Sequence, residues 1–430
     1  MNEHFQQFLL HVLIQLSVII LASRIGAWVF GKLGQPQVVG EIIAGLALGP
    51  SVLGRFAPHA VGYLFPEDAN IVFRVLSELG LVLLMFLIGL EFDFSHLRHV
   101  GKTASGVAAA GIGLPFVLGS ILAAWLHPMV AADTNRIGFV LILAVALSIT
   151  AIPILGRIMI ELNIQRTRLG TLTITAAAID DAFGWILLAA VSAVIHGGFQ
   201  LFIVARMALL TLGFVLTCWF VARPILIRCA DCLLHRGNRD LTVSGLSAVL
   251  VTVLLAAAIT NAIGVFAIFG PFVLGAVLSD RHAFRDAVGR RLREMVYALF
   301  LPVFFTYTGL RTNVGLLESG FDWMLCGLVF AAATIGKMLG CGVAARLGGL
   351  SWRECGCVSV MMNTRALMGL IAINVGRELG VVPDRVFSML VIMAVATTLL
   401  TTPVLRRLLA EATGTTPSHR PTTTDHADHR

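Results

Sequence analysis

The segment that decides the fold runs from Leu169 to Val194 and reads LGTLTITAAAIDDAFGWILLAAVSAV. It is apolar and long enough to span a bilayer, yet two adjacent carboxylates, Asp180 and Asp181, lie near its centre. A charge at the centre of a bilayer costs roughly 2.5–3.5 kcal/mol even on the more lenient insertion scale. Two such residues in succession therefore indicate an intramembrane acidic site for a cation, a proton or both.

The composition of the whole chain is that of a polytopic membrane protein. Of its 430 residues, 57% are hydrophobic and 13% are charged, and the mean hydropathy is +0.90. This is more apolar surface than the interior of a soluble fold of this length can bury. The sequence predicts an all-α membrane protein with about thirteen transmembrane segments. They are 8–30, 38–54, 71–91, 103–126, 137–160, 168–196, 199–222, 241–261, 265–279, 295–310, 322–345, 354–376 and 386–405.

The net charge of +7 reflects topology, and we expect no binding to nucleic acid. Most of the 31 lysines and arginines fall in one alternate set of loops. The opposite set holds Arg55, Arg136, Arg311, Arg377 and Arg385. By the positive-inside rule, this asymmetry predicts an N-terminus outside and a C-terminus in the cytoplasm. Residues 411–430 are polar and rich in Thr, His and Pro, which predicts a disordered cytoplasmic tail.

Span 137–160 is interrupted by the motif SITAIP. Pro153 removes a backbone donor and presses against the carbonyl of Ile149. Carbonyls freed at membrane depth are tolerated only against protein or water, and the hydroxyls of Ser148 and Thr150 lie beside this break. A simple proline kink would explain the motif taken alone, but its place just before the aspartate segment favours an ion site.

Span 354–376 holds a second interruption, formed by Asn363, Thr364 and Arg365. Two interrupted segments in corresponding halves of a chain indicate crossed, broken helices around an ion site at the membrane midplane. The dipoles of the half-helices would meet there. We expect the charge of Arg365 to neutralise the helix-dipole charge on one side of the crossing. The hydroxyls of Thr150 and Ser148 at the first break would supply oxygen ligands.

Lys337, in the motif GKMLG, lies deep within a predicted span. Snorkelling to the interface is the alternative explanation, but a long apolar run precedes this lysine and a shorter one follows. Pairing with Asp180 or Asp181 is the better explanation.

Two further segments carry acidic residues within predicted spans. Glu78 follows Arg74 by four residues, which predicts a local ion pair on one helix. Glu41 lies in the glycine-rich segment 35–50, and we interpret those glycines as points of close helix packing.

Three functional classes use buried acidic groups of this kind. An intramembrane aspartyl protease needs two aspartates that face each other from separate helices, whereas Asp180 and Asp181 lie about 100° apart on one helix. A passive cation channel also uses broken helices, but a buried lysine beside a carboxylate suits alternating occupancy better than fast conduction. We predict a transporter and not an enzyme, a secondary antiporter exchanging Na+ or K+ for protons, with the passive cation channel as the alternative. No cofactor is predicted, and no metal beyond the transported cation.

Six motifs, in order along about residues 10–405, resemble the monovalent cation:proton antiporter superfamily, in its branch of bacterial Na+/H+ or K+/H+ antiporters. They are Gln35–Leu53, Leu79–Glu91, Ser148–Pro153, Ala178–Trp185, Gly336–Gly340 and Asn363–Arg365. The resemblance implies that Asp181 binds the cation or proton and that Asp180 is the partner of Lys337. In one departure, Gly369 stands where many relatives carry an acidic residue.

The resemblance also implies an architecture. One transmembrane domain, 1–410, would consist of inverted repeats divided between a scaffold, about 1–102 and 241–320, and a mobile core, about 103–196 and 321–410. A linker helix would cover about 197–240. We expect a homodimer in the bacterial cytoplasmic (inner) membrane, with no appended nucleotide-binding domain.

Overall fold

The computed structural model describes residues 3–59, 64–65, 70–91, 102–162, 164, 167–196, 201–236 and 241–413, and its described regular structure is entirely helical. The first half contains α1 (Glu3–Lys32), α2 (Gln37–Leu48), α3 (Leu53–Phe56), α5 (Asn70–Glu91), α7 (Lys102–Val130), α8 (Arg136–Ser148), α9 (Ile152–Glu161), α10 (Arg168–His196), α11 (Leu201–Thr217) and α12 (Arg223–Arg236). The second half contains α13 (Val243–Ile263), α14 (Phe269–Val277), α15 (His282–Met295), α16 (Leu301–Leu310), α17 (Gly320–Leu347), α18 (Trp352–Met362), α19 (Ala366–Glu378) and α20 (Asp384–Thr413). Short helical turns cover η2 (Cys218–Ala222), η3 (Val296–Phe300) and η4 (Val314–Leu316).

The fold is the predicted all-α membrane fold, but the predicted number of spans is not confirmed. Within the described residues, nine helices are long and apolar enough to cross a membrane, or ten when the bent pair α18–α19 is counted as one. Every predicted span contains a helix. However, predicted span 265–279 contains only the nine-residue α14, and predicted span 295–310 contains the ten-residue α16 after a π-helical turn. Both predicted runs are shorter than the roughly 20 residues that a span needs. The first begins directly after the turn at Gly264, whose φ of 97° ends α13 at Ile263.

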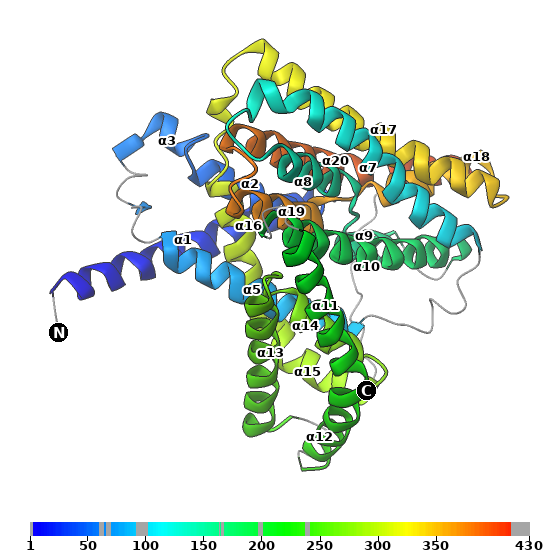
Figure 1. Ribbon diagram of the computed structural model, residues 1–430. Coiled ribbons are helices and arrows are strands. Elements are labelled where there is room, and N and C mark those ends of the chain that lie inside the picture. The colour runs from blue at the N-terminus through cyan, green and yellow to red at the C-terminus, as the bar shows by residue number, and fades with distance from the viewer. Residues whose placement is uncertain are drawn as a thin grey trace, which may run out of the picture.

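The helices that carry the site motifs occur twice in the same order. A long helix, a broken helix and a second long helix form α7, α8–α9 and α10, with lengths of 29, 13, 10 and 29 residues. The same order returns in α17, α18–α19 and α20, with lengths of 28, 11, 13 and 30 residues. Figure 1 shows α7 and α17 side by side along one edge of the molecule, away from α12 and α13.

Glycine allows α2 and α16 to cross in direct backbone contact. A Cβ atom added at Gly45 would lie 2.1 Å from the carbonyl oxygen of Thr306, and one added at Gly309 would lie 2.2 Å from that of Ile42. Any larger residue would force the helices apart, because such distances are far below van der Waals contact. The interpretation of the glycine-rich segment 35–50 as a packing surface is confirmed.

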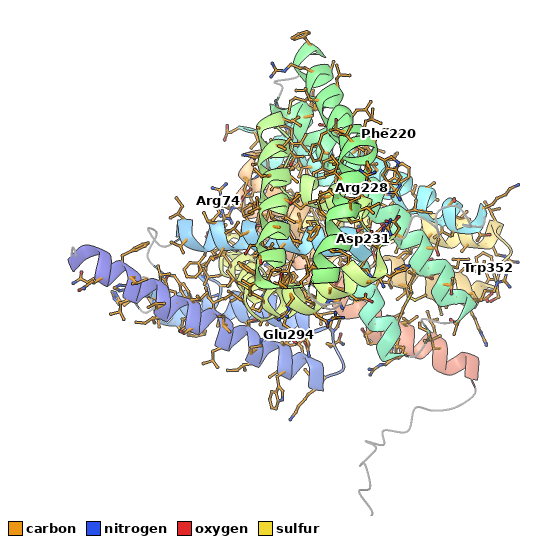
Figure 2. All side chains as sticks on the ribbon, turned by 90° about the horizontal axis from the view of Figure 1, so that it is seen from below. Arg74, Phe220, Arg228, Asp231, Glu294 and Trp352 are labelled. Carbon is orange, nitrogen blue, oxygen red and sulfur yellow. The ribbon has the colours of Figure 1, made fainter. Side chains whose placement is uncertain are left out.

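The predicted span 199–222 is part of a longer helix. α11, η2 and α12 follow one another without a break from Leu201 to Arg236. The π-helical turn η2 ends two residues before Pro224, whose ring presses against the carbonyl four residues back, within η2, and widens the turn. Phe220 is 69% exposed, and Figure 2 labels it with Arg228 and Asp231 along this helix.

The predicted tail, 411–430, lies outside the described residues except for the last turn of α20, which ends at Thr413.

Candidate functional site

The first predicted interruption occurs where the sequence indicates it. α8 ends at Ser148, Ile149 is extended, and α9 begins at Ile152. Pro153 is the second residue of α9, a position where its missing N–H breaks no helical hydrogen bond.

The second predicted interruption is also formed. α18 ends at Met362 and α19 begins at Ala366, with a 42° bend between them. The new helix is capped by a side chain from α20. The hydroxyl of Thr398 accepts hydrogen bonds from the backbone N–H groups of Ala366 at 3.1 Å and Arg365 at 3.4 Å, two groups that have no partner within α19.

The two interruptions contact each other. The backbone N–H of Ala151 donates to the carbonyl of Thr364 at 2.7 Å, and the hydroxyl of Thr150 donates to the carbonyl of Met362 at 2.8 Å. These bonds satisfy backbone groups that the breaks release, so the polar backbone is stable at membrane depth. The predicted crossing of two broken helices is confirmed.

Arg365 ties this crossing to its neighbours. Its side chain is fully buried, and its guanidinium donates to the carbonyls of Leu147 and Ala333, the latter at 2.7 Å, and to Oδ1 of Asn363 at 3.3 Å. The Leu147 carbonyl belongs to the last turn of α8, where the helix dipole is negative and a cation is stabilising. Within the described chain Arg365 has no carboxylate partner.

Asp180 has a complete set of partners. Lys337 Nζ lies 3.0 Å from each of its carboxylate oxygens, and the backbone N–H of Thr150 donates to Oδ2 at 2.8 Å. The lysine donates further to the carbonyl of Ser148 at 2.5 Å. Both charged side chains are fully buried. The predicted ion pair between Lys337 and a central aspartate is therefore present, and Asp180 is the aspartate that forms it.

Asp181 is different from its neighbour. It is 0% exposed, and neither carboxylate oxygen has a hydrogen-bond partner among the described residues. The indole N–H of Trp185, one turn further along α10, lies near this carboxylate but forms no hydrogen bond of normal geometry among the described residues. A buried carboxylate without a hydrogen bond of normal geometry is costly unless it holds a proton or a cation, so Asp181 has the properties of a site for either.

The hydroxyls predicted to supply oxygen ligands for the cation lie at the two breaks, and among the described residues they form no hydrogen bond with Asp181. The Ser148 hydroxyl donates to the carbonyl of Ala144 at 2.6 Å, and that of Thr150 to Met362. The Thr364 hydroxyl donates to the carbonyl of Met361 at 3.0 Å. A hydroxyl that donates to a carbonyl keeps its oxygen lone pairs as acceptors.

The family described as sodium/hydrogen exchanger, transmembrane, matches residues 19–411. This chain belongs to that family. It is 37% identical over 411 residues to the Na(+)/H(+) antiporter NhaS4 of Synechocystis, and the match covers 93% of this chain and 97% of NhaS4. It is 36% identical over 393 residues to cation/H(+) antiporter 18 of Arabidopsis thaliana, covering 91% of this chain and 48% of that one. The chain thus spans about half the length of its plant relatives and nearly all of the cyanobacterial one.

The sodium proton antiporter NhaP1 from Methanocaldococcus jannaschii has a similar structure. The TM-score is 0.54 with 16% sequence identity, and the match covers 94% of this chain and 98% of that one. At this identity the likeness concerns the fold alone.

Two features of the site region differ from the sequence predictions or were absent from them. The ion pair of Arg74 is with Glu378 on α19, with Nε 3.3 Å from Oε1, and not with Glu78 on its own helix, on which Arg74 acts only at longer range. Thr398 was not predicted as a cap of α19. The signal available was the threonine-rich segment 397–402 within an apolar helix.

Proposed function

We propose that this chain is a secondary antiporter that exchanges a monovalent cation, Na+ or K+, for protons, and that Asp181 binds both. One observation carries the proposal. Asp181 is a buried carboxylate without a partner in the described chain, one residue from an aspartate whose partners are complete. The names of the relatives, Na(+)/H(+) and cation/H(+) antiporters, support the same reaction.

Competition for one pair of oxygens explains the exchange. A proton or a cation neutralises Asp181, but both do not occupy it together. The protein changes its access from one side of the membrane to the other when the site is neutral, because moving an uncompensated charge through the membrane is costly. Loading with a cation on one side and with protons on the other then links the two fluxes.

The remaining site residues have distinct proposed roles. Hard monovalent cations prefer oxygen ligands, so the hydroxyl oxygens of Thr150 and Ser148 would complete the coordination begun by Asp181. Arg365 would stabilise the negative end of α8, with Asn363 holding its guanidinium. Asp180 and Lys337 would form a second charge pair beside the site, which would open when a cation binds at Asp181.

The division into scaffold and core remains a proposal. The scaffold would comprise 1–102 and 241–320, the core 103–196 and 321–410, and the linker 197–240. The direct glycine contact between α2 and α16 lies within the proposed scaffold, and the packing of α7 against α17 lies within the proposed core. We also propose a homodimer in the bacterial cytoplasmic membrane, with the N-terminus outside.

The passive cation channel gains no support, because the relatives carry antiporter names. The experiment that separates the two uses everted membrane vesicles with a pH-sensitive dye. Adding Na+ or K+ to acid-loaded vesicles should restore the dye fluorescence, because cation entry removes protons. Cation flux without proton movement would establish a channel instead.

A further inference from the structure

A cavity lies away from the aspartates, between α5, α16 and α19. It has a volume of about 30 Å³ and is lined by apolar side chains together with polar and charged side chains from these helices. They include Ser77, Glu78, Thr308, Asn374 and Glu378. In the proposed architecture, α5 and α16 belong to the scaffold and α19 to the core.

Two carboxylates from different helices meet at this cavity. The Glu78 and Glu378 side chains both line it and are close enough for each to affect the charge of the other. Glu378 is paired with Arg74, labelled in Figure 2. Glu78 has no basic partner within 4 Å among the described residues, so its charge is compensated only at longer range. Arg74 lies near both carboxylates, but its single positive charge balances only one of the two negative charges.

A buried hydroxyl without a partner belongs to a residue that lines the same cavity. Ser77 is 6% exposed and lines the cavity, and no group in the described chain forms a hydrogen bond with its hydroxyl. Buried hydroxyls are usually satisfied, so this one points to a ligand or water in the cavity. Nearby, the Asn374 amide donates through Nδ2 to the Thr308 hydroxyl at 3.2 Å, which leaves its oxygen as an acceptor.

We propose that this cavity is a second binding site for the transported monovalent cation, on the outer part of its route. Glu78 and Glu378 would be the charged ligands, and Ser77 and Asn374 would supply neutral oxygens. α19 begins at the crossing and ends at Glu378, so one helix contributes to both regions. With a rise of about 1.5 Å per residue, Asn374 lies about 13 Å along the helix from Arg365.

The cavity should bind a cation weakly. Arg74 and Arg311 line it as well, so their charges oppose a further cation. Weak binding suits a position from which the ion must move on. This proposal rests on the proposed antiport, because the cation is the same.

The experiment measures binding of ²²Na+ and ⁸⁶Rb+ to purified protein that carries Asp181→Asn, which removes the proposed central site. We expect residual saturable binding with a Kd at least tenfold higher than that of the unmodified protein. Adding Glu78→Gln should abolish the residual binding. Adding Glu318→Gln, which removes an exposed carboxylate outside the cavity, should leave it unchanged.

Ser77→Ala is a second variant, which tests the cavity even if the Glu78→Gln variant misfolds. It should raise the Kd of the residual binding several-fold while the elution volume in size-exclusion chromatography stays constant. The outer site is refuted if Asp181→Asn alone abolishes cation binding, or if residual binding survives both Glu78→Gln and Ser77→Ala. Either result leaves the antiport itself to be judged by the vesicle experiment.

Discussion

Lys337 Nζ lies 3.0 Å from both carboxylate oxygens of Asp180, and both side chains are fully buried. The pair connects α17 to α10, and the lysine also binds a carbonyl at the end of α8. Three helices of the site are therefore held by one ammonium group. Its neighbour in sequence, Asp181, has none of these contacts.

Removing one member of this pair should destabilise the protein strongly. Lys337→Met leaves Asp180 buried with an uncompensated charge, which costs about 3–5 kcal/mol in comparable pairs. We expect a clear fall in the thermal unfolding temperature of the purified protein, measured by intrinsic fluorescence. The double variant Lys337→Met/Asp180→Asn should recover part of the loss, because no buried charge then remains unpaired. An unchanged unfolding temperature for Lys337→Met would show that the ion pair contributes little.

Asp181→Asn should abolish exchange and leave the protein as stable as before. The amide neither binds a proton in the working range nor offers a charged ligand, and Asp181 has no partner in the described chain to lose. Dye recovery in everted vesicles measures the exchange, and thermal unfolding measures the stability. Recovery near the original level would disprove the assignment of Asp181.

The sequence predicted both breaks and the lysine–aspartate pair for local reasons. Pro153 and the run Asn363–Arg365 disfavour a continuous helix in any structural context. A buried Lys337 has few possible partners. The residues alone did not decide between the adjacent aspartates, because that choice depends on the rotation of α10 against α17.

Contacts between distant parts of the chain were beyond local patterns. Arg74 pairs with Glu378 and not with Glu78, because the fold brings Glu378, distant in sequence, to the same cavity. The predicted number of spans was not confirmed, for a related reason. Short apolar runs such as 265–279 do not reveal how much of their length is helical.

Thr398→Val should destabilise the second break. Its hydroxyl accepts from the first two backbone N–H groups of the α19 terminus, and loss of such a cap costs about 1 kcal/mol. Thr402→Val is the matched control on the same helix, since the Thr402 hydroxyl is buried without a partner in the described chain. We expect a lower unfolding temperature for Thr398→Val only. Equal effects would mean that the cap contributes nothing.

Gly45→Ala should disrupt the crossing of α2 and α16. The added methyl group would lie 2.1 Å from the Thr306 carbonyl oxygen, so the helices must separate, at a cost of about 1–3 kcal/mol or more. Gly327→Ala on α17 provides the control, because a Cβ there meets nothing within 4 Å and alanine favours helix. Thermal unfolding should show a loss for the first variant and no loss for the second. Tolerance of Gly45→Ala would contradict the direct backbone contact.

The charge moved in each transport cycle depends on whether the Asp180–Lys337 pair opens. If the pair opens when a cation binds at Asp181, Lys337 releases a proton of its own, and two protons exchange for one cation. If the pair persists, only Asp181 binds protons, and exchange is one for one without net charge. Lys337 and the two carboxylates lie together at the site. The Lys337 ammonium already donates to the carbonyl of Ser148 at the first break, and this bond would hold the ammonium near the site when the pair opens. We therefore expect electrogenic exchange, seen as a transient current after a Na+ or K+ jump on a solid-supported membrane, with Asp181→Asn giving none. Confirmed proton exchange without any current would establish the pair as purely structural.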